Sequence, residues 1–327
     1  MAEDKTVVVQ ARDIKKYFTA DRSMRADKPV VKAVDGVSMN IYDHEVYGLV
    51  GESGCGKSTF GRTLLRLLEP TEGKIEINGI DITELSEKEL RAQRGNMQMI
   101  FQDPYTSLNP RRKIGQILDE VLVIHGMKNP RMRMDLTLDI MARVGLRPEH
   151  YYRYPHEFSG GQRQRVGLAR ALILNPKFVV CDEPVSALDV SIQSQIINLL
   201  LDLKEKSDLT YLFIAHDLSV VKYISTRIGV MYLGHLVEEA SADALFSNPL
   251  HPYTKALLSA VPSTAVGRKK ERIVLRGELP SPLNPPSGCP FHTRCPFAKP
   301  YCAEIPPQDL EVETGHRVQC FLYNDVN

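Results

Sequence analysis

The stretch Gly51-Glu52-Ser53-Gly54-Cys55-Gly56-Lys57-Ser58-Thr59 decides the fold of this chain. It fits the pattern G-x-x-x-x-G-K-[ST], in which glycines let successive backbone N–H groups face one concavity. An apolar, β-prone run over 46–50 precedes it, and the run over 59–68 has helical spacing. Lys57 can reach the β- and γ-phosphates of a nucleotide, and the Ser58 hydroxyl can bind Mg²⁺. The strand, loop and helix together predict an α/β protein that binds a nucleotide.

The composition is that of an ordinary globular protein. Of its 327 residues, 43% are hydrophobic and 25% are charged, and the formal net charge is +1. A net charge so close to zero gives no basic field for nucleic acid. No apolar run approaches the ~20 residues that span a bilayer. The first five residues are polar and carry no signal-peptide core. We therefore expect a cytosolic protein whose membrane association, if any, comes through a partner.

Strand-like and helix-like segments alternate along most of the chain. Short β-prone runs lie at 7–9, 34–41, 74–79 and 97–102, and 110–155 is mostly helical in pattern. Strand and helix then alternate from 178 to about 236, which predicts βαβ units with a parallel sheet. Beyond Pro249 the chain carries prolines at 280, 282, 285, 286, 290 and 296. This composition predicts an irregular tail.

Two carboxylates end a strongly apolar strand. The run Phe178-Val179-Val180-Cys181 leads directly into Asp182 and Glu183. Side chains at the carboxyl end of a strand face the ligand crevice of an α/β sheet. Together with the phosphate loop, the position predicts that Asp182 belongs to the Mg²⁺ shell. Glu183 is then placed to polarise the water that attacks the nucleotide.

A second glycine-bearing segment lies at Ser159-Gly160-Gly161-Gln162, before a helical run that ends at Leu172. Backbone N–H groups at the start of a helix suit phosphate. One nucleotide needs only one such cradle, so a second one suggests a composite site across a dimer. The alternative is an ordinary N-capped helix with a glycine-rich beginning.

The six cysteines fall into two groups. Cys55 and Cys181 sit in the loop and in an apolar strand, where they are expected to pack. Cysteine also clusters late in the chain, which in the cytosol indicates metal rather than disulfides. The four late residues are Cys289, Cys295, Cys302 and Cys320. Four thiolates suit Zn²⁺ or an iron–sulfur cluster, and the spacing alone leaves both open. His292 and His316 lie nearby and are expected to be bystanders.

Taken in order along the chain, these motifs resemble the ATP-binding cassette (ABC) family. The series also includes Gln102 after a strand, Ser186-Ala187-Leu188-Asp189, and His216 after the apolar run 211–215. The resemblance implies an α/β P-loop ATPase of the ABC type. It would have a mixed or parallel β-core, a helical subdomain at about 103–173, and an irregular cysteine-containing extension. The implied domains are a nucleotide-binding domain over 1–248 and a C-terminal extension over 249–327.

The resemblance also implies roles for single residues. ATP would be bound by Tyr17, Gly51, Ser53, Gly54, Cys55, Gly56, Lys57, Ser58 and Thr59, with Tyr17 stacking on adenine. Mg²⁺ would be held by Ser58, Gln102 and Asp182. The catalytic residues would be Glu183, His216, which would contact the γ-phosphate, and Gln102. Gln102 would also signal the state of the ATP site to the transmembrane partner. The opposite subunit would meet the signature Ser159, Gly160, Gly161 and Gln162, and the D-loop Ser186, Ala187, Leu188 and Asp189.

Some segments make the resemblance more specific than the ABC family as a whole; they are 51–56, 101–104, 107–110, 182–190 and 251–254. These look like the ATPase subunits of oligopeptide and dipeptide importers, and within them the F-type subunit. The resemblance implies a D-type ATPase partner, two transmembrane permease subunits and an extracytoplasmic binding protein, with the chain peripheral at the cytoplasmic face of the inner membrane. It also favours a [4Fe–4S] cluster over Zn²⁺ at the late cysteines. Tyr105, Ser107 and Leu108 would form a groove for a short permease helix.

Two other functions deserve comparison. A soluble ABC ATPase could act on DNA or ribosomes, but the near-zero charge, the lack of a coiled-coil insertion and the single cassette argue against it. A phosphate-loop kinase or GTPase would have no use for Ser159-Gly160-Gly161-Gln162. The sequence does not identify the cargo. Short peptides are expected, and relatives move other small polar solutes, nickel among them.

Overall fold

The structure is a computed structural model that describes residues 6–19, 30–102, 108–186, 188–261, 273–275 and 277–323. The chain divides into two compact units. The helical unit consists of 1–8, 42–45 and 84–214, and the phosphate-loop unit consists of 9–41, 46–83 and 215–327. The phosphate loop and the late cysteines therefore belong to one unit. The signature segment and the two carboxylates belong to the other.

The phosphate-loop unit contains two groups of strands. The first, in the order β2-β1-β4-β5, is made of β2 (Val30–Tyr42), β1 (Val7–Thr19), β4 (Glu72–Ile77) and β5 (Ile80–Asp81), and β4 pairs antiparallel with both β1 and β5. In the second, β3 (Val46–Val50) pairs in parallel with β9 (Arg227–Tyr232), and antiparallel pairs then add β10 (His235–Ser241), β12 (His316–Gln319) and β11 (Asp309–Glu313). Every residue of β3 is buried, so the strand that leads into the phosphate loop is fixed on both faces.

The described residues of this unit also form the α-helices α1 (Lys57–Leu64), α8 (Leu218–Ile224), α9 (Ala242–Ser247) and α10 (Pro252–Ser259). Helix α1 is shorter than the sequence predicts, because Arg66 adopts a left-handed φ of 51° just beyond it. Strands β1 and β2 are longer than the predicted runs. The register of β1 shifts between Arg12 and Lys15, and this irregularity lets the strand continue through polar residues.

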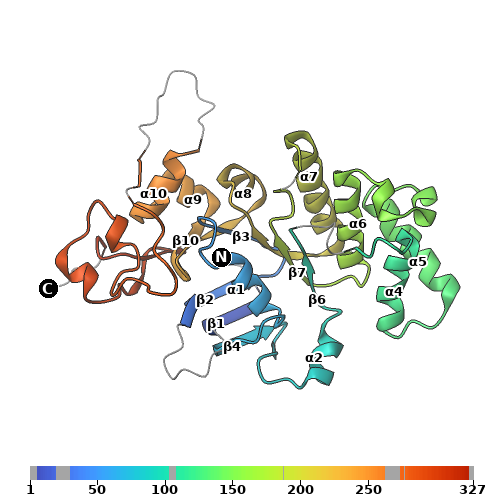
Figure 1. Cartoon of the computed structure of the whole chain (residues 1–327), viewed down its shortest axis with the longest axis horizontal. Helices are drawn as coiled ribbons and strands as arrows, with labels where there is room; N and C mark the ends of the chain where they lie inside the picture. Colours follow the sequence, from blue (N-terminus) through green and yellow to red (C-terminus); the bar gives the residue numbers. More distant parts are fainter. Residues whose placement is uncertain are drawn as a thin grey trace. The chain divides into compact units, whose positions relative to one another are not determined.

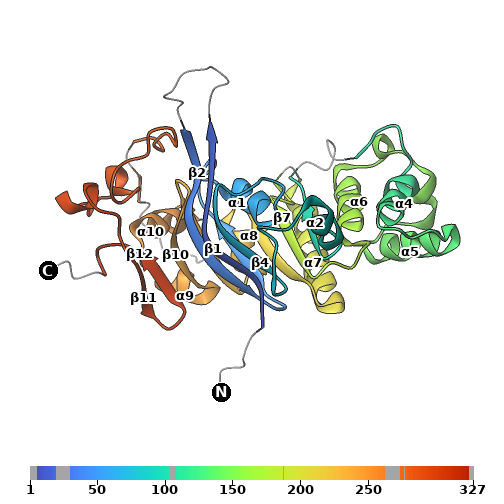
Figure 2. The ribbon, with the colours of Figure 1, turned by 90° about the horizontal axis from the view of Figure 1, so that it is seen from below.

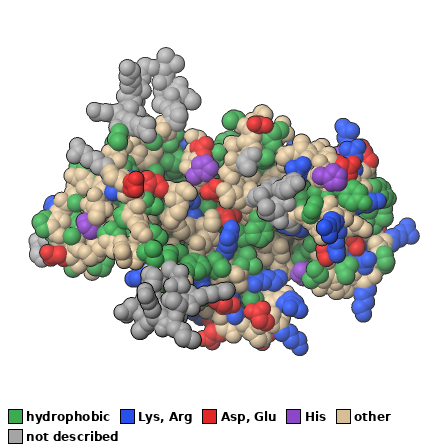
Figure 3. Space-filling model, in the orientation of Figure 1, with side chains coloured by type: hydrophobic (Ala, Val, Ile, Leu, Met, Phe, Trp, Pro, Cys, Tyr) green, Lys and Arg blue, Asp and Glu red, His purple; other side chains and the backbone are tan. Residues whose placement is uncertain are grey.

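The helical unit is built on three parallel strands. These are β6 (Met97–Ile100), β7 (Phe178–Asp182) and β8 (Thr210–Ile214), with β7 in the middle. Its helices are α2 (Glu87–Gln93), α4 (Ile114–Ile124), α5 (Pro130–Arg143), α6 (Gly160–Leu172) and α7 (Val190–Ser207). Helices α4 and α5 lie beside α6 (Figure 1). Val123, Ile124 and Met132 of these two helices are exposed, and Figure 3 shows hydrophobic side chains at the surface of the molecule. Strand β7 is buried at every position, which places its two terminal carboxylates at a fixed point.

The tail is irregular in part, as the sequence predicts. Only the short 3₁₀ turns His292–Arg294 and Pro300–Ala303 form among the described residues between 277 and 308. The end of the chain then returns as the β11–β12 hairpin, which continues the sheet beyond β10 (Figure 2). The sequence did not predict this hairpin, because most side chains of β11 face solvent and give no apolar alternation. Among the described residues, no helix is long and apolar enough to cross a bilayer.

Candidate functional site

The phosphate loop leads from β3 into α1 without a side-chain cap. Gly56 is the N-cap of α1, and its φ of 105° lies in the left-handed region. A side chain there would also place its Cβ 2.1 Å from the Ala33 carbonyl oxygen, so only glycine fits. Gly56 has no side chain with which to cap the first turn of α1. A helix that begins this way offers backbone N–H groups and the positive end of its dipole to an anion.

Lys57 lies inside its own loop. Its side chain is only 4% exposed, and its Nζ donates hydrogen bonds to the carbonyl oxygens of Gly51 at 2.8 Å and Glu52 at 3.0 Å. The ammonium is thus held by neutral acceptors, and phosphate oxygens are stronger acceptors for it. Ser58 and Thr59 follow in the first turn of the helix, where the sequence predicts their contacts with Mg²⁺ and phosphate.

Cys55 is buried and takes part in packing within the loop, as expected. Its Sγ lies 3.6 Å from the Lys57 Nζ. Ser53 and Gly54 are exposed, and a Cβ built on Gly54 would meet nothing within 4 Å. The tip of the loop therefore has open space on the side where a ligand must approach.

Two predicted catalytic residues meet in the helical unit. Glu183 directly follows β7, and Gln102 follows β6 after one residue. The Gln102 Nε2 donates a hydrogen bond of 2.9 Å to the Glu183 Oε2. Asp182 is fully buried at the end of β7. The structure therefore brings the proposed base and the proposed sensor residue together, next to the proposed Mg²⁺ ligand.

Glu183 has an unusual backbone. Its φ is 46°, a left-handed conformation that costs energy for a side chain other than glycine. The Glu183 N–H donates to the Ile214 carbonyl oxygen of β8 at 3.0 Å, and the Ser186 hydroxyl donates to the Glu183 carbonyl oxygen at 3.2 Å. These bonds hold the Glu183 backbone at the strand end, and the Gln102 amide holds the carboxylate, which a general base requires to be well positioned.

The signature segment begins α6 with a complete capping box. The Ser159 Oγ accepts the Gln162 N–H at 3.4 Å, and the Gln162 Oε1 accepts the Ser159 N–H at 3.0 Å. These two N–H groups are thus satisfied within the helix start itself, which is the ordinary capping arrangement. Gly160 and Gly161 lie between them. The Cβ that each lacks would come within 3.5 Å of Leu188 and 2.6 Å of Ile192, respectively.

The D-loop lies between β7 and α7. Asp189 is the N-cap of α7 but forms no side-chain capping bond. Ser186 and Leu188 precede it, and Ala187 lies outside the described residues, as do Tyr105 and Ser107 of the predicted permease groove. Leu108, the remaining groove residue, is 3% exposed. The predicted contacts of these residues with a second subunit or a permease stay predictions.

Tyr17 and His216 are placed in the phosphate-loop unit. Tyr17 lies on β1, its hydroxyl donates to the Asp35 Oδ1 at 2.5 Å, and the Lys32 Nζ lies 5.4 Å from the centre of its ring. Burial raises the pKa of Tyr17 above its usual range. His216 is exposed and precedes Asp217, the N-cap of α8. The adenine contact of Tyr17 and the γ-phosphate contact of His216 stay predictions.

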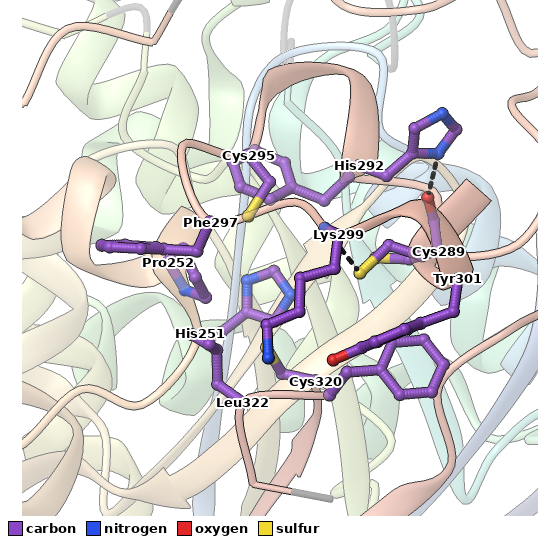
Figure 4. Close-up of a pocket in the computed structure, with 13 residues that line it drawn as sticks. His251, Pro252, Cys289, His292, Cys295, Phe297, Lys299, Tyr301, Cys320 and Leu322 are labelled. Carbon is purple, nitrogen blue, oxygen red and sulfur yellow. Dashed lines mark hydrogen bonds between the residues drawn. The ribbon is translucent and has the colours of Figure 1, made fainter. Parts of the chain in front are cut away.

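The four late cysteines line one pocket (Figure 4). Its other walls include Phe291 and His251, and the Cys295 sulfur points inward in the close-up. Burial raises the pKa of the Cys289 thiol to about 12 and that of Cys320 to about 11. In the part of the chain that the structure describes, no three His, Cys, Asp or Glu side chains lie close enough together to hold a metal ion. The structure therefore gathers the predicted ligands around one space without forming a metal site.

The two predicted bystander histidines have other partners. The His316 Nε2 lies 2.8 Å from the Glu238 Oε1, and both side chains are buried. The His292 Nδ1 lies 2.9 Å from the Cys289 carbonyl oxygen.

Two residues that contact the phosphate loop were not predicted from the sequence. Tyr253 and Arg294 both bind Glu52, from positions 201 and 242 residues further along the chain. No motif or periodicity connects residues so far apart. Only the observation that the arginine directly precedes Cys295 marks its segment as special.

Two known protein families match different parts of the chain. The ABC transporter family matches residues 34–186, and the family described as oligopeptide/dipeptide transporter, C-terminal region, matches residues 237–302. The chain is 56% identical to the oligopeptide transport ATP-binding protein AppF of Bacillus subtilis, over 99% of both chains. It is 49% identical to the dipeptide transport ATP-binding protein DppF of Escherichia coli, over 96% of this chain and 94% of that protein.

Solved structures agree with this picture. A dimeric post-hydrolysis state of the ATP-binding cassette MJ0796, bound to ADP and phosphate, matches 72% of this chain and 98% of its own, with 27% identity and a TM-score of 0.64. CbiO1 of Clostridium perfringens, part of the ABC transporter complex cbiONQ, matches 75% of this chain and 92% of its own, with 25% identity and a TM-score of 0.64. The predicted α/β fold of the ABC type is confirmed.

Proposed function

The chain belongs to the ABC transporter family, among the oligopeptide and dipeptide transport ATP-binding proteins, and we propose that it is the F-type ATPase subunit of a peptide importer. It binds and hydrolyses ATP, and this hydrolysis powers the import of dipeptides or oligopeptides. The observation that carries the proposal is the match to AppF along 99% of the chain, which includes the phosphate loop as well as the tail. An ABC ATPase that acts on DNA or ribosomes is not favoured, because the relatives are transport proteins.

The first chemical task is to hold the triphosphate. The N–H groups at the start of α1 and the Lys57 ammonium would bind the phosphate oxygens of ATP. Support comes from the glycine N-cap of α1 and from the buried Lys57, whose ammonium contacts two loop carbonyl oxygens and the Cys55 sulfur. Mg²⁺, held by Ser58, Gln102 and Asp182, would neutralise charge on the phosphoryl group that is transferred.

The second task is to activate water. Glu183 would accept a proton from a water that attacks the γ-phosphorus in line. Gln102 donates to the same carboxylate, so it can orient Glu183 and the water together. The left-handed backbone at Glu183 supports the assignment, because strained conformations concentrate at functional sites. His216 would contact the γ-phosphate and Tyr17 would stack on adenine.

The partners are inferred from the family. A second, D-type ATPase subunit would complete composite ATP sites, to which this chain contributes the signature Ser159–Gln162 and the D-loop 186–189. Two transmembrane permease subunits and an extracytoplasmic binding protein would complete the transporter, with this chain peripheral at the cytoplasmic face of the membrane. Support comes from the dimeric ABC cassettes among the structural neighbours.

The cysteine pocket is proposed to hold a [4Fe–4S] cluster, with Zn²⁺ as the alternative. The donor set fits, since four cysteines line one largely apolar space and four thiolates are what such a cluster requires. The bound cluster or metal would stabilise the fold of the C-terminal tail, which has little apolar surface of its own. Protein purified without oxygen should be brown and contain about four irons per chain. Colourless protein with one zinc would favour the alternative.

A reconstitution experiment tests the transport function. The chain is assembled with its D-type partner, permeases and binding protein in proteoliposomes that contain Mg²⁺ and ATP on the ATPase side. We expect uptake of a labelled di- or tripeptide that requires ATP and stops in the Lys57→Ala variant. Peptide uptake that continues unchanged in that variant, or an active complex that forms without this chain, would contradict the proposal.

A further inference from the structure

Two side chains from outside the phosphate loop bind it at Glu52. The Tyr253 hydroxyl accepts the Glu52 backbone N–H at 2.8 Å. The Arg294 guanidinium donates two hydrogen bonds to the Glu52 carboxylate, with Nη1 at 2.7 Å from Oε2 and Nη2 at 3.1 Å from Oε1. The Arg294 side chain is 8% exposed and the Glu52 side chain is 30% exposed. A bidentate, partly buried pair of this kind fixes orientation as well as position.

Both gripping residues come from the C-terminal part of the chain. Tyr253 lies in α10, and Arg294 ends a 3₁₀ turn immediately before Cys295. Both contact Phe291, whose ring packs 5.5 Å from that of Tyr253 and whose carbonyl oxygen accepts the Arg294 N–H at 3.0 Å. Phe291 also lines the cysteine pocket. The packing around this pocket therefore determines where the hydroxyl and the guanidinium meet the loop.

Because Glu52 is negatively charged, its ion pair with Arg294 affects how the loop binds an anionic ligand. Glu52 lies between Gly51 and Ser53, and its carbonyl oxygen accepts the Lys57 Nζ at 3.0 Å. An uncompensated carboxylate here would repel the phosphates that the loop is proposed to bind. Arg294 neutralises that carboxylate, and Tyr253 holds the backbone of the same residue.

We propose that the C-terminal extension is a positioning element of the ATP site, in which Arg294 and Tyr253 hold Glu52 in an ATP-competent loop and Arg294 cancels its charge. The proposal rests on the function above only in that ATP is the ligand of the loop. In this proposal the tail raises the affinity of the loop for ATP. This role is separate from the stabilisation of the tail by a group bound in the cysteine pocket.

The test measures the Kd of the full-length chain for a fluorescent ATP analogue with Mg²⁺. Losing a charge-assisted pair should raise the Kd of Arg294→Ala roughly tenfold. Glu52→Gln removes the charge that Arg294 cancels. The double variant Arg294→Ala with Glu52→Gln should therefore bind within about threefold of wild type, which a merely structural role for Arg294 does not predict. Tyr253→Phe loses one neutral hydrogen bond and should raise the Kd about threefold.

Arg317→Ala is the matched control, because Arg317 forms its ion pairs with Asp309 on β11 and Glu239 on β10 and should leave the Kd unchanged. A Kd for Arg294→Ala within twofold of wild type would overturn the proposal, and so would a double variant that binds worse than Arg294→Ala alone. If Arg294→Ala does not fold, an unchanged Kd in the isosteric Tyr253→Phe variant would overturn it. Failure of the wild-type chain to bind ATP would instead count against the proposed function.

Discussion

Helices α1 and α6 both begin in a glycine-rich turn, yet their first turns are satisfied in different ways. At α1 the N-cap is Gly56, which has no side chain with which to cap the first turn. At α6 the N-cap is Ser159, and it exchanges two hydrogen bonds with Gln162. The start of α1 therefore offers backbone N–H groups to an anion, whereas α6 satisfies two of its own with a capping box. Similar glycine-rich sequences thus produce a phosphate-binding helix start at α1 and a helix start with its own capping box at α6.

The difference extends to charge. Lys57 is buried at the start of α1 and its ammonium points back into the loop. The segment 159–162 carries no charged side chain. The signature can therefore add contacts to a nucleotide that another subunit holds, but it has no cation of its own with which to capture one.

Glu183→Gln should have the largest effect, because it removes the chemistry and leaves both helix starts intact. General-base catalysis is worth roughly 10²- to 10⁴-fold. ATP turnover at this site in the assembled transporter should fall by that factor, while the Kd for ATP stays within about threefold of wild type. Glu205→Gln, at an exposed position of α7, is the control. Near-normal turnover in Glu183→Gln would remove Glu183 from the mechanism.

Lys57→Ala should weaken ATP binding by the isolated chain. Loss of the charged contact with phosphate should raise the Kd roughly 10- to 100-fold, as measured by titration with a fluorescent analogue. Lys74→Ala, at a lysine of the same unit that pairs with Glu76, should leave the Kd unchanged. Equal affinity in Lys57→Ala and wild type would mean that α1 does not begin at the phosphate site.

A third helix start should respond to pH. The Nδ1 of His251 accepts the Tyr253 N–H and so caps α10, which requires a neutral ring. Burial lowers the pKa of His251 from 6.5 to about 4. Between these values the unfolded chain binds more protons, so the contribution of His251 is complete above pH 6.5 and is lost as the pH falls toward 4. The loss is about 3 kcal/mol in the free energy of unfolding.

Asparagine is a good N-cap that does not titrate, so His251→Asn should flatten the fall in stability between pH 6.5 and 4. Chemical unfolding at a series of pH values measures this slope. His44→Asn is the control, since His44 is exposed and asparagine tolerates its left-handed φ of 55°. An unchanged slope in His251→Asn would show that His251 is not the titrating group.

Ser159→Ala should have the smallest effect on stability, about 1 kcal/mol from the lost cap. Ser86→Ala is a close control, because Ser86 and Glu89 form the same capping box at the start of α2. Both variants should lose similar stability and keep the ATP affinity of the isolated chain. Only Ser159→Ala should lower ATP turnover in the assembled complex. Equal turnover in both variants would leave the signature with a capping role alone.

The elements around the phosphate loop could be predicted because their signals are local. The buried strand 46–50, the glycines and Lys57 lie within a dozen residues, and β7 ends at the predicted carboxylates. The capping box at α6 was also readable, since Ser159 and Gln162 match the S-x-x-Q pattern. The ion pair between Arg294 and Glu52 could not be predicted, because no motif or periodicity connects two residues that are 242 positions apart. The β11–β12 hairpin escaped prediction because its stability comes from pairing with β10 rather than from its own pattern.

Hydrogen exchange on the full-length chain, with and without Mg²⁺ and ATP, compares the two helix starts most directly. Amide protons over 54–60 should gain protection when ATP is added, because phosphate oxygens accept their N–H groups. Those over 160–163 should not change in the chain without its partner subunit. Protection that appears at the start of α6 and not at the start of α1 would contradict the account.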